Sequence, residues 1–298
     1  LPSTRRHTRY SWQSRGLGDV YKSQVCDCQR TRRELLGGAL VGAVGAAAAQ
    51  SLGGCGQDDP DDSDDAGLTE LSPIAELTAV DVAPGLRIHP RDQWGADLPP
   101  TRAIAPETVK FLLVHHTASS NTVPDPRRVI RQTFAFHTGP DKRWPDICYH
   151  FMISPDGAVW ETRSGSLAGP VVADATGGNQ GYAQLVCMIG DFTGTPPTPA
   201  AQESLARTLL FLADRYDVDT DPAATTTFVS RGSNRFRSGS VVTTSTISGH
   251  RDVTYTACPG DVGYALLPGW RNRVNATRLQ RNDPGPIKRA VRRDVHLI

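Results

Sequence analysis

The chain has 298 residues, of which 38% are hydrophobic and 21% are charged, and its formal net charge is +1 at pH 7. This composition can bury a core and leaves room for one large domain or two small ones, which excludes a wholly disordered chain, a collagen repeat and a coiled coil. A net charge so close to zero gives no general reason to expect a nucleic-acid partner. Six cysteines are too few for a disulfide scaffold.

The first 54 residues have the pattern of an export signal. They carry a net charge of +5, and Arg32 and Arg33 precede an uncharged apolar run over residues 35–49. This run matches the apolar part of a signal peptide and is shorter than the ~20 residues that span a bilayer. The paired arginines resemble a twin-arginine signal, and residues 52–55 (LGGC) resemble a lipobox, in which Cys55 is lipidated. We therefore expect an exported protein that is lipid-anchored at the cell envelope or secreted.

An acidic segment follows this signal region. Six aspartates lie between residues 58 and 65, and no basic residue occurs between residue 58 and Arg87. Such a segment buries little apolar area and is typical of a solvated, disordered tether. The sequence thus predicts four regions: the signal region 1–54, the acidic linker 55–85, a globular domain 86–280 and a basic tail 281–298.

The globular region alternates predicted strands with predicted helices. Asp125-Pro126 and Thr198-Pro199 are N-cap and N1 pairs, and each precedes a helix with one apolar stripe. Short runs rich in strand-forming residues lie before and between these helices, at residues 109–114, 149–153, 158–161 and 184–189. This alternation favours an α/β layer structure.

Two further β-prone runs, residues 225–229 and 241–246, flank a loop of residues 230–240 that carries three arginines and no acidic residue. The pattern predicts a protruding hairpin. We interpret its loop as a solvated surface feature, with contact to a substrate as the alternative.

Three residues in two motifs have the chemistry of a metal site. His115 and His116 end an apolar strand, and strand alternation sends their rings to opposite faces, so at most one of them can serve a given site. His250 and Cys258 lie eight residues apart, within one loop. Two imidazole nitrogens and one thiolate are standard zinc ligands and leave a fourth position for water. A cysteine–histidine nucleophile pair is the competing chemistry, but it leaves the histidine at the strand end unexplained.

Several segments together resemble the peptidoglycan recognition proteins and the related zinc N-acetylmuramoyl-L-alanine amidases, including small phage enzymes. The resemblance extends from about residue 87 to about residue 267, and the hairpin is similar to that of exported actinobacterial members. The matching segments are residues 91–96 (RDQWGA), 111–118 (FLLVHHTA), 144–153 (WPDICYHFMI), 156–157 (DG) and 248–261 (SGHRDVTYTACPGD).

The resemblance implies a central mixed sheet flanked by helices and a monomeric enzyme that hydrolyses the amide between N-acetylmuramic acid and L-alanine in peptidoglycan. Its zinc ligands would be His115, His250 and Cys258, with Tyr149 and Thr256 as catalytic residues. Members that bind without cleaving typically lack the cysteine ligand, which this chain keeps. The alternatives are a module that recognises muropeptides without turnover, and a hydrolase of the same fold acting on another acylated sugar or peptide.

One stretch departs from the family pattern. Members usually carry a histidine in the loop that here reads Leu167-Ala168-Gly169-Pro170, so part of the substrate groove should differ. His137 and His150 match family positions that are not ligands, and we expect both to be hydrogen-bonded structural residues. Glu161 is expected to be solvated or ion-paired rather than a general base. Cys148 and Cys187 are predicted in core strands, as free thiols or as a cross-strand disulfide.

Overall fold

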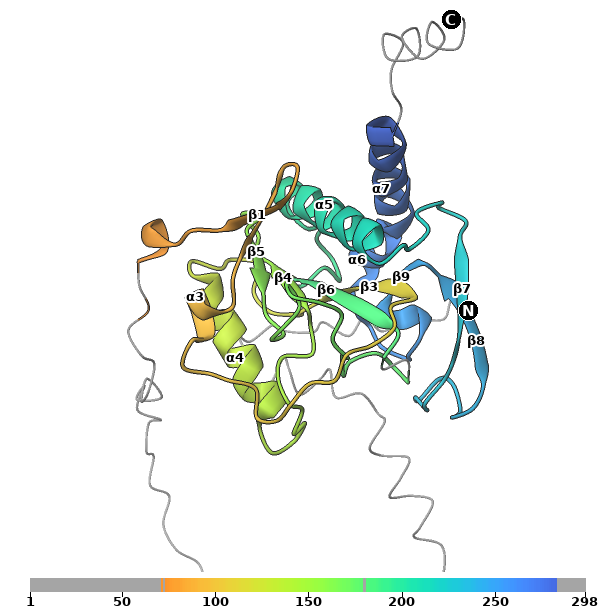
Figure 1. The fold of residues 1–298 in the computed structure, drawn as a ribbon, viewed down its shortest axis with the longest axis horizontal. Helices are drawn as coiled ribbons and strands as arrows, with labels where there is room; N and C mark the ends of the chain where they lie inside the picture. Colours follow the sequence, from red (N-terminus) through yellow and green to blue (C-terminus); the bar gives the residue numbers. More distant parts are fainter. Residues whose placement is uncertain (1–70, 72, 179–180, 283–298) are drawn as a thin grey trace, which may run out of the picture.

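The computed structural model describes residues 71, 73–178 and 181–282 (Figure 1). The predicted signal region with Arg32, Arg33 and Cys55 lies outside the described residues, as do residues 55–70 of the predicted linker and 283–298 of the tail. The described part forms a seven-stranded sheet with helices on both faces and a separate two-stranded hairpin.

The sheet is mixed, as the sequence predicts, and its strand order is β1-β2-β5-β4-β6-β3-β9. Strand β3 is parallel to both β6 and β9, whereas β4 is antiparallel to β5. The sheet begins before the predicted boundary at residue 86, because β1 pairs with β2. The strands are β1 (Val80–Ala83), β2 (Leu86–His89), β3 (Phe111–His116), β4 (Phe151–Ile153), β5 (Val159–Glu161), β6 (Ala183–Met188) and β9 (Ile247–Gly249).

Strands β3 and β6 form the centre of the core. Every residue of both strands is buried, which explains their largely apolar sequences. Strand β3 extends through His116, which confirms that the two histidines end the strand, and its register pairs His115 with Cys187 and His116 with Met188. It begins at Phe111 rather than at residue 109.

Strand β4 begins at Phe151, so the predicted strand 149–153 is too long at its start. Regular pairing stops there because the backbone N–H groups of Thr162 and Arg163 both donate to the carbonyl of His150. Tyr149 therefore precedes the strand and does not belong to it.

Helix α4 (Pro126–Thr138) covers one face of the sheet, and α5 (Pro199–Arg215) with α7 (Leu267–Asn282) covers the other (Figure 1). Both predicted N-caps are confirmed: Asp125 accepts a hydrogen bond from the Arg127 N–H, and Thr198 accepts one from the Ala201 N–H. The shorter helices are η2 (Ile74–Glu76), α3 (Asp92–Gly95), η3 (His250–Asp252) and α6 (Asp261–Ala265). Among the described helices, none combines the length and apolar character that crossing a bilayer requires.

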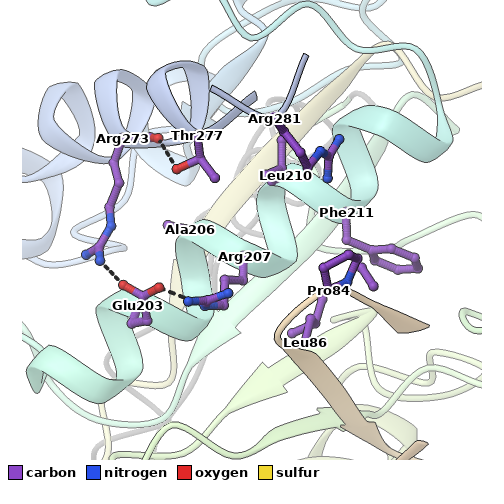
Figure 2. A pocket seen from close by; sticks show the side chains of 11 residues that line it. Pro84, Leu86, Glu203, Ala206, Arg207, Leu210, Phe211, Arg273, Thr277 and Arg281 are labelled. Carbon is purple, nitrogen blue, oxygen red and sulfur yellow. Dashed lines mark hydrogen bonds and ion pairs between the residues drawn. The ribbon is translucent and has the colours of Figure 1, made fainter. Parts of the chain in front are cut away.

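The predicted hairpin is present as β7 (Thr225–Val229) and β8 (Val241–Ser245), which pair antiparallel. A hollow of about 150 Å³ lies elsewhere, between the β1–β2 turn, α5 and α7 (Figure 2). Glu203 forms ion pairs with both Arg207 and Arg273 at its rim. The hollow lies against α5 and α7, on the sheet face opposite to the one that carries His115.

Candidate metal centre

The sheet register brings His115 and His250 together. Strands β3 and β9 are parallel, and Val114 is the partner of Gly249. The next residue along the chain is His115 at the end of β3 and His250 at the start of η3, and their ring centroids lie 4.3 Å apart. Both side chains are buried, with exposed fractions of 1% and 5%.

Cys258 returns to this pair from the loop after η3. Its Sγ lies 3.6 Å from His115 Nδ1 and accepts a hydrogen bond from the His116 backbone N–H at 3.4 Å. The Arg251 N–H donates to the Cys258 carbonyl at 3.2 Å, which closes the loop between His250 and Cys258.

Gly260 allows the loop to turn immediately after Cys258. Its φ is +85°, and a Cβ at this position would lie 2.3 Å from the carbonyl carbon of Phe192. Its N–H donates to the Ala257 carbonyl at 2.7 Å. Only glycine fits both the backbone angle and the close approach.

The donor set of His115, His250 and Cys258 fits zinc. Their candidate ligand atoms all lie within 4.8 Å of one another. Zinc–nitrogen and zinc–sulfur bonds of ~2.0 and ~2.3 Å in a tetrahedral site place the two donors about 3.5 Å apart. The Cys258–His115 separation of 3.6 Å agrees with that value.

The electrostatics of the two histidines suit the same role. Burial lowers the pKa of His250 to about 3 and that of His115 well below its ordinary value. The two rings are therefore neutral at pH 7, the state in which imidazole binds a metal. Each also has a buried Nε2 with no hydrogen-bond partner among the described residues.

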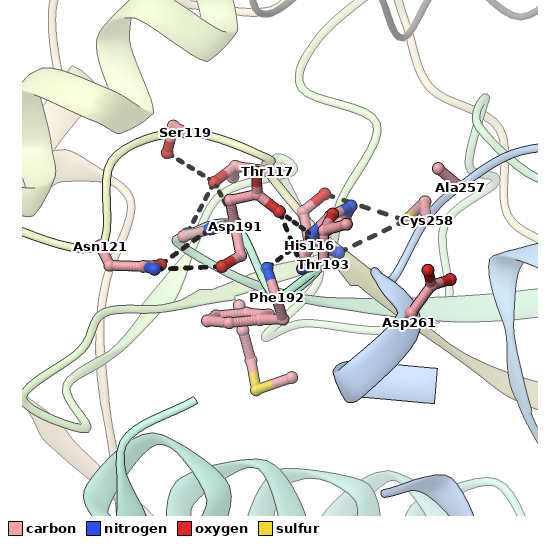
Figure 3. Close-up of polar contacts among 12 residues, drawn as sticks. His116, Thr117, Ser119, Asn121, Asp191, Phe192, Thr193, Ala257, Cys258 and Asp261 are labelled. Atoms are coloured by element: carbon pink, nitrogen blue, oxygen red, sulfur yellow. Dashed lines mark hydrogen bonds and ion pairs between the residues drawn. The ribbon is translucent and has the colours of Figure 1, made fainter. Parts of the chain in front are cut away.

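His116 faces the other side of the strand, as alternation predicts. Its Nδ1 accepts a hydrogen bond from the Phe192 N–H at 3.3 Å, and its ring lies 6.0 Å from the Phe192 ring (Figure 3). Thr117 continues this polar network through Ser119 and the Gly190 N–H, at 2.7 and 2.9 Å. His116 thus supports the metal centre through its backbone, while its side chain packs away from it.

Tyr149 lies beside the metal residues. Its ring is 5% exposed and its centroid is 5.2 Å from that of His115. Its hydroxyl also hydrogen-bonds to the thiols of Cys148 and Cys187. Burial raises the pKa of both thiols well above the ordinary value, so they remain protonated.

Thr256 is half-buried, and its Oγ1 accepts a hydrogen bond from the Cys258 N–H at 3.2 Å. The threonine is thus tied to the backbone of a metal-binding residue. Thr256 lies two residues before Cys258, where the family resemblance expects a catalytic residue. Its hydrogen bond with the Cys258 N–H is a structural contact.

His137, His150, Cys148 and Cys187 have structural roles. His150 accepts a hydrogen bond from the Leu185 N–H at 2.8 Å, and His137 accepts one from the Cys148 N–H at 3.3 Å. Cys148 and Cys187 are buried free thiols, so the alternative of a disulfide is wrong. Cys148 also lies ahead of β4 rather than within a strand.

Glu161 differs from its expected state. It is only 7% exposed, and its carboxylate accepts hydrogen bonds from the Leu167 and Arg91 backbone N–H groups at 2.8 and 3.4 Å. Burial raises its pKa. The carboxylate therefore links the backbone at Arg91 to the backbone at Leu167 and does not face solvent.

Sequence reasoning missed a buried ionic framework behind the site. Arg163 is fully buried, pairs with Asp174 at 2.8 Å and donates to the Ile147 carbonyl at 2.7 Å. Arg91 forms an ion pair at 3.0 Å with Asp146, whose side chain is fully buried. These pairs hold the segment that leads into Tyr149, but lone arginines and aspartates carry no signal of burial in a sequence.

Comparison with known proteins places the chain in a family. The family model described as N-acetylmuramoyl-L-alanine amidase (Amidase_2) matches residues 105–261. The human N-acetylmuramoyl-L-alanine amidase is 30% identical over 221 residues, which cover 67% of this chain and 32% of that protein. Peptidoglycan-recognition protein SD of Drosophila simulans is 29% identical over 203 residues, which cover 67% of this chain and 94% of the relative.

The crystal structure of Drosophila peptidoglycan recognition protein SD aligns with a TM-score of 0.48 and 23% identity over 61% of this chain and 94% of that structure. The chain spans about a third of the length of the mammalian amidases that it matches. The family model covers more than half of the chain, and the chain belongs to the N-acetylmuramoyl-L-alanine amidase (Amidase_2) family.

Proposed function

We propose that the protein is a zinc-dependent N-acetylmuramoyl-L-alanine amidase, which hydrolyses the amide between N-acetylmuramic acid and L-alanine in peptidoglycan. The observation that carries the proposal is the convergence of His115, His250 and Cys258, with their ligand atoms within 4.8 Å of one another. A nucleophilic cysteine would need only one histidine, whereas the second buried histidine fits a metal centre.

In this proposal the three residues hold the zinc, which supplies Lewis acidity at the carbonyl and lowers the pKa of a bound water. His115 and His250 remain neutral because both are buried. The backbone N–H of His116 stabilises the negative charge of the Cys258 thiolate.

Tyr149 and Thr256 supply the hydroxyls that orient water and stabilise the oxyanion. The Tyr149 ring stands 5.2 Å from that of His115, and Thr256 lies two residues before Cys258. Donors already held in place stabilise developing charge without reorganisation. We assign no carboxylate base, because Glu161 is occupied by backbone N–H groups.

The second candidate is a recognition module that binds muropeptide without turnover. The match to a relative named as a recognition protein, over 94% of that relative, favours it. Two measurements on the purified protein separate the candidates: metal content, and release of free L-alanyl amino termini from peptidoglycan. Zinc with release supports the amidase, and zinc with muropeptide binding but no release supports the module. Turnover of non-muramyl amides alone would indicate a different hydrolase.

We also propose that the protein is exported through a twin-arginine signal and anchored through Cys55. This proposal rests on the sequence of residues 32–55. Replacing Arg32 and Arg33 with lysine should retain the protein in the cytoplasm, and Cys55→Ala should release it from the membrane fraction. A soluble mature protein whose N-terminus is not Cys55 would refute the anchor while leaving export intact.

A further inference from the structure

The β7–β8 hairpin covers the sheet face that carries the metal centre. Phe228 of β7 is 2% exposed and stacks on Phe111 of β3 with 5.4 Å between ring centroids. Phe111 and His115 are four residues apart on one strand, so their side chains share a face. The hairpin therefore packs beside the site and not on the far side of the molecule.

The loop of this hairpin is fastened to the segment that joins His250 to Cys258. The Asn234 side chain donates to the Tyr255 carbonyl at 3.0 Å and accepts from the Tyr255 N–H at 2.9 Å. Ser233 Oγ donates to the Val253 carbonyl at 3.4 Å, and Arg235 donates to the Arg251 carbonyl. Four contacts thus hold the hairpin loop against the metal-binding loop.

These contacts fix the backbone of an exposed aromatic residue in the segment that joins His250 to Cys258. Tyr255 lies three residues before Cys258 and is 68% exposed, whereas the preceding Thr254 is 3% exposed. The guanidinium of Arg235 lies 5.8 Å from the centre of the Tyr255 ring. Such a cation–π contact restricts a long, exposed side chain to a few orientations.

The same loop is strongly cationic. Arg231, Arg235 and Arg237 are all exposed, and residues 230–240 include no acidic residue. The nearest acidic residues of the metal-binding loop are already engaged: Asp252 accepts from Tyr264 and Asp261 pairs with Arg251. The Arg231 guanidinium lies over the Tyr182 ring, 5.4 Å from its centre. We call Arg235, Arg237 and Tyr255 the arginine rim.

We infer that the arginine rim binds a carboxylate of the peptide portion of the substrate and so makes the enzyme selective for peptides that carry free acids. The inference rests on the proposed function, because it assumes a muramoyl peptide in the site. An arginine fork matches the two oxygens of a carboxylate. The N-acetylated sugar, in contrast, is uncharged once its lactyl group is amidated, and offers these cations no such partner.

The test compares N-acetylmuramoyl-L-alanyl-D-glutamate with the same compound amidated at both carboxyl groups. We expect the wild-type protein to favour the free acid by about tenfold in kcat/KM, the scale of one charge-assisted hydrogen bond. Arg235→Gln and Arg237→Gln should each reduce this preference, because KM for the free acid should rise more than KM for the amidated compound. Arg235→Lys should retain most of the preference, because it keeps the charge.

Arg207→Gln is the matched control, because Arg207 is an exposed arginine at the hollow beside α5, away from the hairpin. It should leave the preference unaltered. A loop disturbed by loss of the Arg235–Arg251 contact would slow both compounds equally, whereas loss of a carboxylate contact slows only the free acid.

Equal turnover of the two compounds by the wild-type protein would overturn the inference and leave the amidase intact. Without turnover of either compound, the proposed function fails, and equilibrium binding of the same two compounds decides the inference. Tighter binding of the free acid that disappears in Arg235→Gln supports the rim, and equal binding refutes it. Preferential binding of peptide-free glycan strands would also refute it.

Discussion

Replacing Tyr149 with phenylalanine separates a catalytic hydroxyl from a structural ring. The ring lies 5.2 Å from that of His115 and 5.6 Å from that of His137, and phenylalanine keeps both contacts. The variant loses the hydrogen bonds of the hydroxyl, which include those to the Cys148 and Cys187 thiols. The free energy of unfolding should therefore fall by about 0.5–1.5 kcal/mol for each buried neutral hydrogen bond that is lost.

The expected effect on turnover is much larger. If the hydroxyl stabilises the oxyanion, Tyr149→Phe removes one donor that acts mainly in the transition state, and kcat should fall about 10²–10³-fold, or ~3–4 kcal/mol. The assay measures kcat and KM on a soluble muropeptide, zinc content and thermal unfolding on the same preparation. Unchanged kcat with a raised KM would refute the catalytic role and assign Tyr149 to substrate binding. A loss of zinc would instead show that the hydroxyl supports the metal residues.

Three further predictions address the metal centre and the stability of the fold. Cys258→Ser should abolish turnover and most zinc binding, because a hydroxyl is a far poorer zinc ligand than a thiolate, whereas His116→Ala should keep its zinc; metal analysis showing the reverse would contradict the assignment. Gly260→Ala should lower the unfolding free energy by at least about 1–2 kcal/mol and weaken zinc affinity, because φ is +85° and the Cβ would meet Phe192; an unaltered melting temperature would refute this. Burial raises the pKa of Glu107 from its ordinary value of 4.5 to about 8, so its contribution to stability is complete below pH 4.5 and is lost as the pH rises through 8. Glu107→Gln should remove this loss and stabilise the protein by about 1–3 kcal/mol at pH 7, with no gain at pH 4; denaturant titrations at both values check it.

Periodicity and helix-capping residues predicted most of the core architecture. The N-cap residues Asp125 and Thr198 identified where α4 and α5 begin, because a side-chain oxygen before a proline is a local signal. Strand β9 carried no such signal, since three residues are too few to show a period. Its place beside β3 depends on long-range pairing that no local pattern encodes.

The grouping of His115, His250 and Cys258 as a candidate metal site could be predicted from the sequence, because imidazole and thiolate are rare donors with narrow chemistry. The residues that support the site could not be predicted from the sequence. Asn234 binds both backbone groups of Tyr255, and Glu161 accepts two backbone N–H groups, yet asparagine and glutamate are ordinary surface residues in most sequences. Only the fold decides which of them is enclosed.

The short parallel pairing of β9 with β3 has a consequence for how the protein becomes active. The Cys258–His115 contact joins residues 143 positions apart, so the entropy of closing that loop must be overcome before the ligand set exists. The chain between them includes β6, which belongs to the sheet, and α4, α5 and the hairpin, which pack on it. Under the proposed function, a zinc ion would bind only the completed fold and would add its binding free energy to native stability. A chain in which β9 has not yet paired with β3 would then lack the ligand set, and with it the proposed hydrolytic activity.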